Sequence, residues 1–146
     1  MLVRRRRLAK LSGRHGGRGV NPQRGFDAAL AAAELSDAPR TARKMGASLW
    51  VGPRLLSVGY NRWQSHPSSD NSEFNRSLHA ENVAIIRRQY YDRLSGFLAL
   101  YVARRLADGS MGCSRPCPNC MALARLAGVR RVWFYNHEGT PEEITL

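Results

Sequence analysis

The spacing of apolar residues along the chain predicts three helices. In residues 26–35 they recur every three or four positions, as on one face of a helix, at Phe26, Ala29, Leu30 and Ala33. A second helix is predicted from about His79, with the same spacing at Val83, Ile86, Tyr90 and Leu94. A third is predicted over residues 116–127, because Pro116 suits a first helical turn and Gly128 suits a helix end.

Four strands are predicted between and after these helices. Residues 46–61 predict two strands joined at Gly52-Pro53, which should pair as a hairpin. The apolar run at residues 97–103 suits a strand buried on both faces, and residues 129–135 predict one more strand. This order predicts an α/β fold, a three-layer α/β/α sandwich around a mixed sheet of about four to five strands. Residues 136–146 are polar and predict no element.

Composition divides the chain into a basic tail and one domain. The chain has 146 residues, of which 43% are hydrophobic, enough for a single domain with a buried core. The net charge is +12, yet residues 1–25 hold eight basic residues and no acidic one. We expect a flexible tail at residues 1–25 and the folded domain at residues 26–146, because few apolar residues offset the ordering entropy of the tail. The tail could bind nucleic acid or be a solvated extension.

The sequence favours a cytoplasmic protein without membrane contact. No apolar run approaches the roughly 20 residues of a membrane helix, and no apolar stretch of signal-peptide length follows the basic N-terminus. Three cysteines are too few, and odd in number, for a disulfide scaffold. Reduced thiols or a metal site fit this content better.

Three residues could bind one metal ion. Cys117 and Cys120 lie three residues apart in the first turn of the third predicted helix, so both thiols should face the same side. A helix N-terminus also favours the thiolate form that binds metal. With His79 they make a Cys2His set, which leaves one position of a Zn²⁺ ion open for water.

Glu81 is the candidate acid and base of this site. On a regular helix His79 and Glu81 would point about 200° apart, so they share a site only if His79 is at the helix cap. Each motif alone has common explanations: a Cys-x-x-Cys pair can be a structural zinc half-site or a redox pair, and a lone His is often a polar cap. The combination at two helix starts matches the signature of zinc-dependent nucleobase deaminases.

From about Arg40 to Tyr135 the chain resembles the cytidine and deoxycytidylate deaminase superfamily. The resemblance is carried by "VGYN" at residues 58–61, "HAE" at 79–81 and "PCPNC" at 116–120. It implies a cytidine-deaminase-like fold and a homo-oligomer.

The resemblance also implies roles for single residues. His79, Cys117 and Cys120 would be the zinc ligands, and Glu81 would be the proton shuttle. Asn61 would hydrogen-bond the sugar of the substrate, although an Asx turn at a strand end is a common alternative.

Other candidate contacts come from residues near these motifs. Tyr60 and Trp63 could stack on a base, although Trp63 could equally pin its loop to the core. Arg115 could contact a phosphate or be an ordinary surface arginine. Cys113 could be a fourth ligand that closes the site, but a free thiol is favoured because Glu81 would have no purpose beside a closed site.

These residues predict a hydrolase with zinc as cofactor. Zinc can lower the pKa of bound water from 15.7 to about 7, which makes hydroxide available, and Glu81 would move the protons. The leading hypothesis is a deaminase that converts cytosine to uracil in a nucleoside or nucleotide such as deoxycytidylate, in nucleotide metabolism. The basic tail favours an alternative, a deaminase of single-stranded DNA or RNA or of transfer-RNA adenosine. A third possibility is a non-catalytic zinc-stabilised nucleic-acid-binding module.

Overall fold

The computed structural model describes residues 6–7, 21–36, 44–62, 79–88 and 97–146, and in them a single mixed sheet. Its strands follow the order β1-β6-β5-β4-β2-β3. Their bounds are β1 Arg6–Arg7, β2 Gly46–Val51, β3 Arg54–Tyr60, β4 Leu98–Ala103, β5 Val129–Tyr135 and β6 Pro141–Thr145. The pair β4 and β5 is parallel, and the other neighbours are antiparallel.

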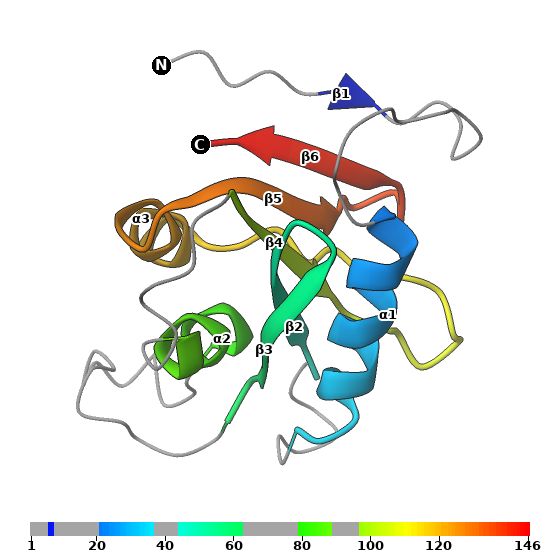
Figure 1. The fold of residues 1–146 in the computed structure, drawn as a ribbon. Helices are drawn as coiled ribbons and strands as arrows, with labels where there is room; N and C mark the ends of the chain where they lie inside the picture. The colour runs from blue at the N-terminus through cyan, green and yellow to red at the C-terminus, as the bar shows by residue number, and fades with distance from the viewer. Residues whose placement is uncertain (1–5, 8–20, 37–43, 63–78, 89–96) are drawn as a thin grey trace.

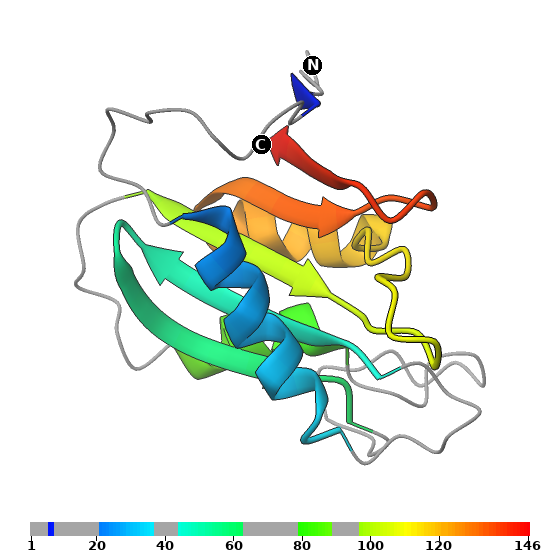
Figure 2. The same cartoon turned by 90° about the vertical axis from the view of Figure 1, so that its right-hand side faces the viewer.

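Helices cover both faces of the sheet. Helix α1 (Pro22–Ala33) lies on one face, and α2 (Ala80–Arg88) and α3 (Pro118–Leu126) lie on the other (Figure 1). The view turned by 90° shows α1 in front of the strands and the other two helices behind them (Figure 2). The predicted three-layer α/β/α fold is therefore confirmed.

The alternation of side chains along the central strands explains why both faces need cover. On β4, Leu100 and Val102 pack with the residues of α2 and α3, whereas Tyr101 and Ala103 pack with Phe26 of α1. Successive side chains of a strand point to opposite faces, so a strand between two helical layers is apolar throughout. The burial of both faces of β4 therefore explains the continuous apolar run at residues 97–103.

Two helices begin at other residues than the sequence predicts. Helix α1 begins at Pro22, four residues before Phe26, because Asn21 caps it by accepting the Gln23 N–H at 3.1 Å. Helix α3 begins at Pro118 rather than near Pro116, and Cys117 is its N-cap residue. Both prolines that follow the caps suit a first turn, since their missing N–H has no partner there.

The remaining predictions for helices and turns have mixed outcomes. Gly128 follows α3 with φ 87°, the left-handed conformation expected of glycine at a helix end. Helix α2 ends at Arg88, and Tyr90 and Leu94 lie outside the described residues. None of the described helices is long and apolar enough to cross a membrane.

The polar C-terminal segment forms a strand that the sequence does not predict. Strand β6 pairs with β5 from Thr145 opposite Arg131 to Pro141 opposite Tyr135. Ile144 is its one buried residue, so the alternating pattern of a half-buried strand is absent. On its other side β6 pairs with β1, a two-residue strand within the predicted tail. The division of the chain at residue 25 stays a prediction.

One edge of the sheet gathers the segments that lead to α2 and α3. Gly46, at the start of β2, pairs with Tyr60 at the end of β3 and with Ala103 at the end of β4. The chain leaves β4 at this edge and enters α3 from it. In sheets with parallel strands, ligands bind outside the carboxyl ends of those strands.

Gly46 provides a test of how tightly α1 packs on the sheet. A Cβ at this position would overlap the Ala29 carbonyl oxygen and lie 2.7 Å from the Ala33 nitrogen. Because helix backbone cannot move aside as a flexible side chain can, we expect Gly46→Ala to lower the free energy of unfolding by about 3 kcal/mol or more, measured by urea denaturation.

Gly109→Ala is the matched control for that substitution. Gly109 has φ 87°, but an added Cβ would meet no atom within 4 Å, so only its left-handed conformation is penalised, by roughly 1–2 kcal/mol. Equal losses in the two variants would contradict the close approach of α1 to β2.

Candidate metal centre

His79 stands at the entry of α2, outside the regular helix. Its carbonyl accepts the Val83 N–H at 3.1 Å, the first hydrogen bond of the helix. His79 is therefore a cap residue. Its side chain need not point about 200° away from that of Glu81, as it would on a regular helix. The structure meets the condition that the sequence set for the two residues to share a site.

The two cysteines occupy the entry of α3. Cys117 has φ −67° and ψ 164°, an extended conformation, and its carbonyl accepts the Met121 N–H at 3.0 Å. Cys120 follows within the first turn, and its sulfur lies 3.4 Å from that of Cys117. Both thiols therefore face one point in space.

The imidazole of His79 meets the two sulfurs. Its Nδ1 lies 3.2 Å from the Sγ of Cys120 and 3.6 Å from the Sγ of Cys117. A tetrahedral zinc ion, with bonds of about 2.3 Å to sulfur and 2.0–2.1 Å to nitrogen, separates its donors by about 3.5–3.8 Å. The three donors fit such an ion after shifts of a few tenths of an ångström, and Cys113 is not part of this group of described residues.

Burial affects the protonation state of the Cys120 thiol. Cys120 is 1% exposed, and burial followed by the charge of Glu81 raises the pKa of its thiol. A buried thiol of this kind stays protonated unless a positive charge compensates the thiolate, and a coordinated metal ion supplies that charge.

Glu81 is buried beside the donors on the first turn of α2. Its side chain is 3% exposed, and burial raises the pKa of its carboxyl group, while its own backbone N–H and His79 oppose that rise. Glu81 follows His79 by two residues at the start of the same helix. Its role in proton transfer stays a prediction.

Ser114 fastens the segment that carries the cysteines. It is fully buried, and its hydroxyl donates to the Val102 carbonyl at 2.7 Å and accepts the Tyr135 N–H at 2.9 Å. The backbone N–H of Ser114 donates to the Tyr135 carbonyl at 2.9 Å. The carboxyl ends of β4 and β5 therefore hold this segment three residues before Cys117. Sequence reasoning missed Ser114, because its partners are 12 and 21 residues away.

Asn61 follows β3 near the same edge. Its Oδ1 accepts the Met45 N–H at 2.9 Å and the Ser36 hydroxyl at 2.8 Å, which ties the end of β3 to the start of β2 and the end of α1. Gly59, two residues earlier, packs on the backbone of Ala80 in α2. Asn61 therefore follows a strand that packs against the first turn of α2, and its contact with a sugar stays a prediction.

The other predicted substrate contacts lie in different surroundings. Arg62 and Arg87 make cation–π contacts with the ring of Tyr60, and each guanidinium carbon lies 5.5 Å from the ring centroid. Arg115 is exposed and stacks over Phe134 at 5.7 Å. Trp63 lies outside the described residues. The substrate roles of Tyr60, Trp63 and Arg115 stay predictions.

Most of the chain matches one known protein family. The family model of the cytidine and deoxycytidylate deaminase zinc-binding region matches residues 20–136. The chain belongs to this family. Its zinc-binding description and the cluster of His79, Cys117 and Cys120 confirm Zn²⁺ as the predicted cofactor, and they support a zinc-dependent deaminase. No curated protein matches the chain.

Solved structures of other deaminases share the fold of this family member. The cytidine deaminase of Burkholderia pseudomallei aligns with TM-score 0.62 at 23% identity, over 84% of this chain and 91% of that chain. The dCMP deaminase of cyanophage S-TIM5 aligns with TM-score 0.58 at 23% identity, over 79% and 82%. The cytidine deaminase of Mycobacterium leprae aligns with TM-score 0.57 at 24% identity, over 85% and 93%.

Zinc content tests the assignment of the ligands. We expect Cys120→Ser and His79→Ala to lower bound zinc from about one ion per chain to a small fraction, because each removes one of three convergent donors. Elemental analysis after dialysis against a mild chelator measures this. Cys113→Ser is the control and should retain its zinc; loss of the ion from that variant would make Cys113 a ligand and the site a closed one.

Proposed function

We propose that this protein is a hydrolytic deaminase that converts cytosine to uracil in a free nucleoside or nucleotide such as deoxycytidylate. The observation that carries the proposal is the buried carboxyl group of Glu81 on the first turn of α2, two residues after His79, which is one of three convergent metal donors. The description of the family names cytidine and deoxycytidylate deaminases, which supports cytosine as the base. Homo-oligomerisation stays a prediction.

Glu81 moves protons in this proposal. Bound zinc supplies Lewis acidity, which lowers the pKa of water. Glu81 takes a proton from the attacking water and passes it to the ring nitrogen, as the water oxygen bonds to the amine-bearing carbon. A second proton then reaches the exocyclic nitrogen through Glu81, the carbon–nitrogen bond breaks, and ammonia leaves. Cytosine and water thereby give uracil and ammonia.

The surroundings of Glu81 suit this role. Burial raises the pKa of its carboxyl group, whereas a divalent cation nearby lowers it. These opposite effects allow the group both to accept and to release a proton. Two cysteine thiolates already balance the charge of Zn²⁺, so the carboxylate is not needed as a ligand.

A polynucleotide substrate is the second candidate. The observation in its favour is the basic N-terminal segment: residues 1–25 hold eight basic residues and no acidic one, and all but Arg24, which lies on α1, precede the helix. Cationic segments bind phosphate backbones with release of counterions, so such binding weakens steeply with salt.

Glu81→Gln tests the catalytic assignment. We expect the variant to keep about one zinc ion per chain and to lose roughly 10²- to 10⁴-fold in kcat, because the amide cannot accept the water proton. Chromatographic measurement of uracil product from deoxycytidylate gives the rate. Glu34→Gln, on the exposed end of α1, is the control and should leave the rate unchanged. Full activity of Glu81→Gln would contradict its role.

A substrate panel with the full chain separates the two candidates. Deoxycytidylate, cytidine, adenosine monophosphate and a cytosine-bearing oligonucleotide are each incubated with the zinc protein at several salt concentrations. We expect uracil from the free cytosine compounds, with kcat/KM that changes little with salt. Conversion of the oligonucleotide alone, with a steep salt dependence, would favour the polynucleotide candidate.

A further inference from the structure

We propose that Ser114 and Arg88 are positioning residues of the metal centre, which hold helix α3 at its two ends and thereby preset its two thiols for a metal ion. Neither residue belongs to the group of metal donors, so both act through the helix. The proposal goes beyond the proposed function, because it depends on the metal centre and not on the base or the substrate.

Helix α3 is weakly fixed by its own residues. Two of its nine residues are buried, Cys120 and Ala124, and Cys120 is itself a metal donor. Met121 and Leu123 add partly buried contacts with the core. The N-cap residue Cys117 makes no capping hydrogen bond with its side chain. Because isolated helices of this length are marginal in water, contacts at the ends of α3 matter for the position of both thiols.

Ser114 joins the start of α3 to two strands at a point where their pairing has ended. The parallel ladder of β4 and β5 ends at Tyr101 opposite Trp133, although both strands continue beyond these residues. There the Ser114 hydroxyl donates to the Val102 carbonyl at 2.7 Å and accepts the Tyr135 N–H at 2.9 Å. The side chain thus bridges the two strand ends in place of a ladder bond, three residues before the first thiol of the site.

Arg88 holds the other end of α3. It lies in the last turn of α2, and its Nη1 donates to the carbonyl of Ala127, the C-cap residue of α3. The last carbonyls of a helix have no partner within the helix, and a positive charge there also interacts favourably with the helix dipole. Since His79 stands at the start of α2, this bond joins the far ends of the two helices whose starts carry the three donors.

Zinc affinity distinguishes a positioning role from a purely structural one. An ion binds more tightly when its ligands are already in place, because ordering them costs conformational entropy. If α3 keeps its place without a given contact, loss of that contact lowers only the stability of the fold. If the helix moves instead, the ion must order it, and the affinity for zinc falls.

Ser114→Ala tests the contact at the start of the helix. We expect this full-length variant to bind zinc about tenfold or more weakly than the wild-type chain, as is typical when a residue that supports metal ligands is removed. Competition with a chromophoric chelator measures the dissociation constant of zinc.

Ser48→Ala is the matched control for Ser114→Ala. Ser48 is also fully buried, and its hydroxyl donates to the Gly25 carbonyl of α1 at 2.7 Å and accepts the Trp50 Nε1–H at 2.8 Å. Both variants leave buried partner groups unsatisfied and should lower the free energy of unfolding. Ser48→Ala should nevertheless keep the zinc affinity of the wild-type chain, because its partners lie on the α1 side of the sheet.

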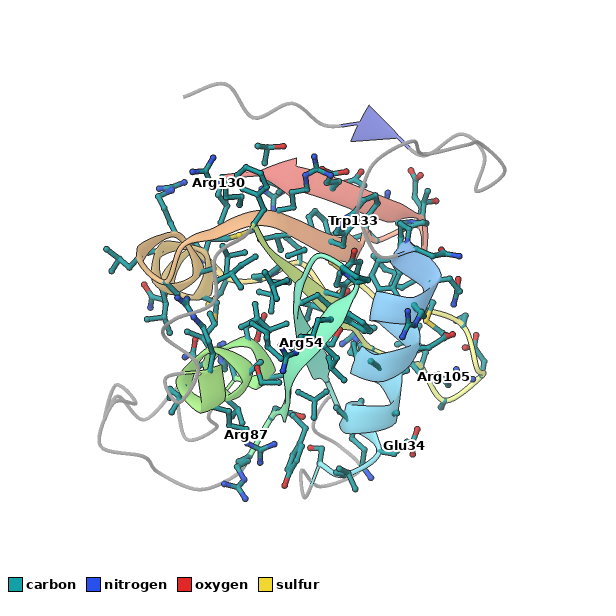
Figure 3. All side chains as sticks on the ribbon, viewed as in Figure 1. Glu34, Arg54, Arg87, Arg105, Arg130 and Trp133 are labelled. Carbon is teal, nitrogen blue, oxygen red and sulfur yellow. The ribbon has the colours of Figure 1, made fainter. Side chains whose placement is uncertain are left out.

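Arg88→Gln tests the other end of the helix and guards against loss of folding in Ser114→Ala. We expect a similar fall in zinc affinity, and Arg88→Lys, which keeps the charge, should recover part of it. Arg87→Gln is the matched control. Arg87 donates from Nη1 to the Val58 carbonyl of β3 at 3.0 Å, and in the view of Figure 3 it and α3 lie on opposite sides of α2. Its loss should leave zinc affinity unchanged.

Cobalt(II) in place of zinc reports on the geometry of the donors. The wild-type chain and the two controls should show the visible absorption of a tetrahedral thiolate complex, and Ser114→Ala and Arg88→Gln should shift or weaken these bands at saturating cobalt. No measurement uses a substrate, so the expected differences would support the inference even if no cytosine compound were deaminated. A variant that equals its control in zinc affinity and in cobalt spectrum refutes the role of its residue, and the inference is overturned if both do.

Discussion

Parallel pairing of β4 with β5 is the constraint on which the metal centre depends. Parallel neighbours cannot be joined by a tight turn, so the chain must cross over between them, and α3 is that crossover. The crossover begins at the carboxyl edge, where Ser114 is bonded to the ends of both strands. This brings the cysteines to the start of α2, although His79 lies 38 residues before Cys117.

At the same edge of the sheet, closely packed helices surround two ionisable side chains that are buried from water. Glycines at positions 46 and 59 let the C-terminal part of α1 and the start of α2 approach the strands closely, so these parts of the two helices have little freedom to move. Against this packing the fold buries a carboxyl group and a thiol, both of which are costly to ionise away from water. Groups of this kind concentrate at functional sites, because their reactivity depends on the surroundings that make them unfavourable.

Much of the site could be predicted because its residues stand at the starts of helices. His79 precedes an apolar helical pattern and the cysteines follow a proline, so local signals locate all three. Ser114 could not be found, since its hydrogen bonds join distant strands. Strand β6 was missed because Ile144 is its one buried residue, and the start of α1 was misplaced because the cap at Asn21 precedes the apolar pattern. The environment of Tyr60 depends on α2 packing beside β3, which is a tertiary contact.

The N-cap position of α3 shows a compromise between helix stability and coordination. Cys117 makes no capping hydrogen bond with its side chain, although serine or aspartate there would satisfy an N–H of the first turn. The chain thus forgoes about 1 kcal/mol of helix stability at this residue. A serine or aspartate at position 117 would turn its side-chain oxygen toward the backbone of α3, and that atom would then no longer be available to a metal ion.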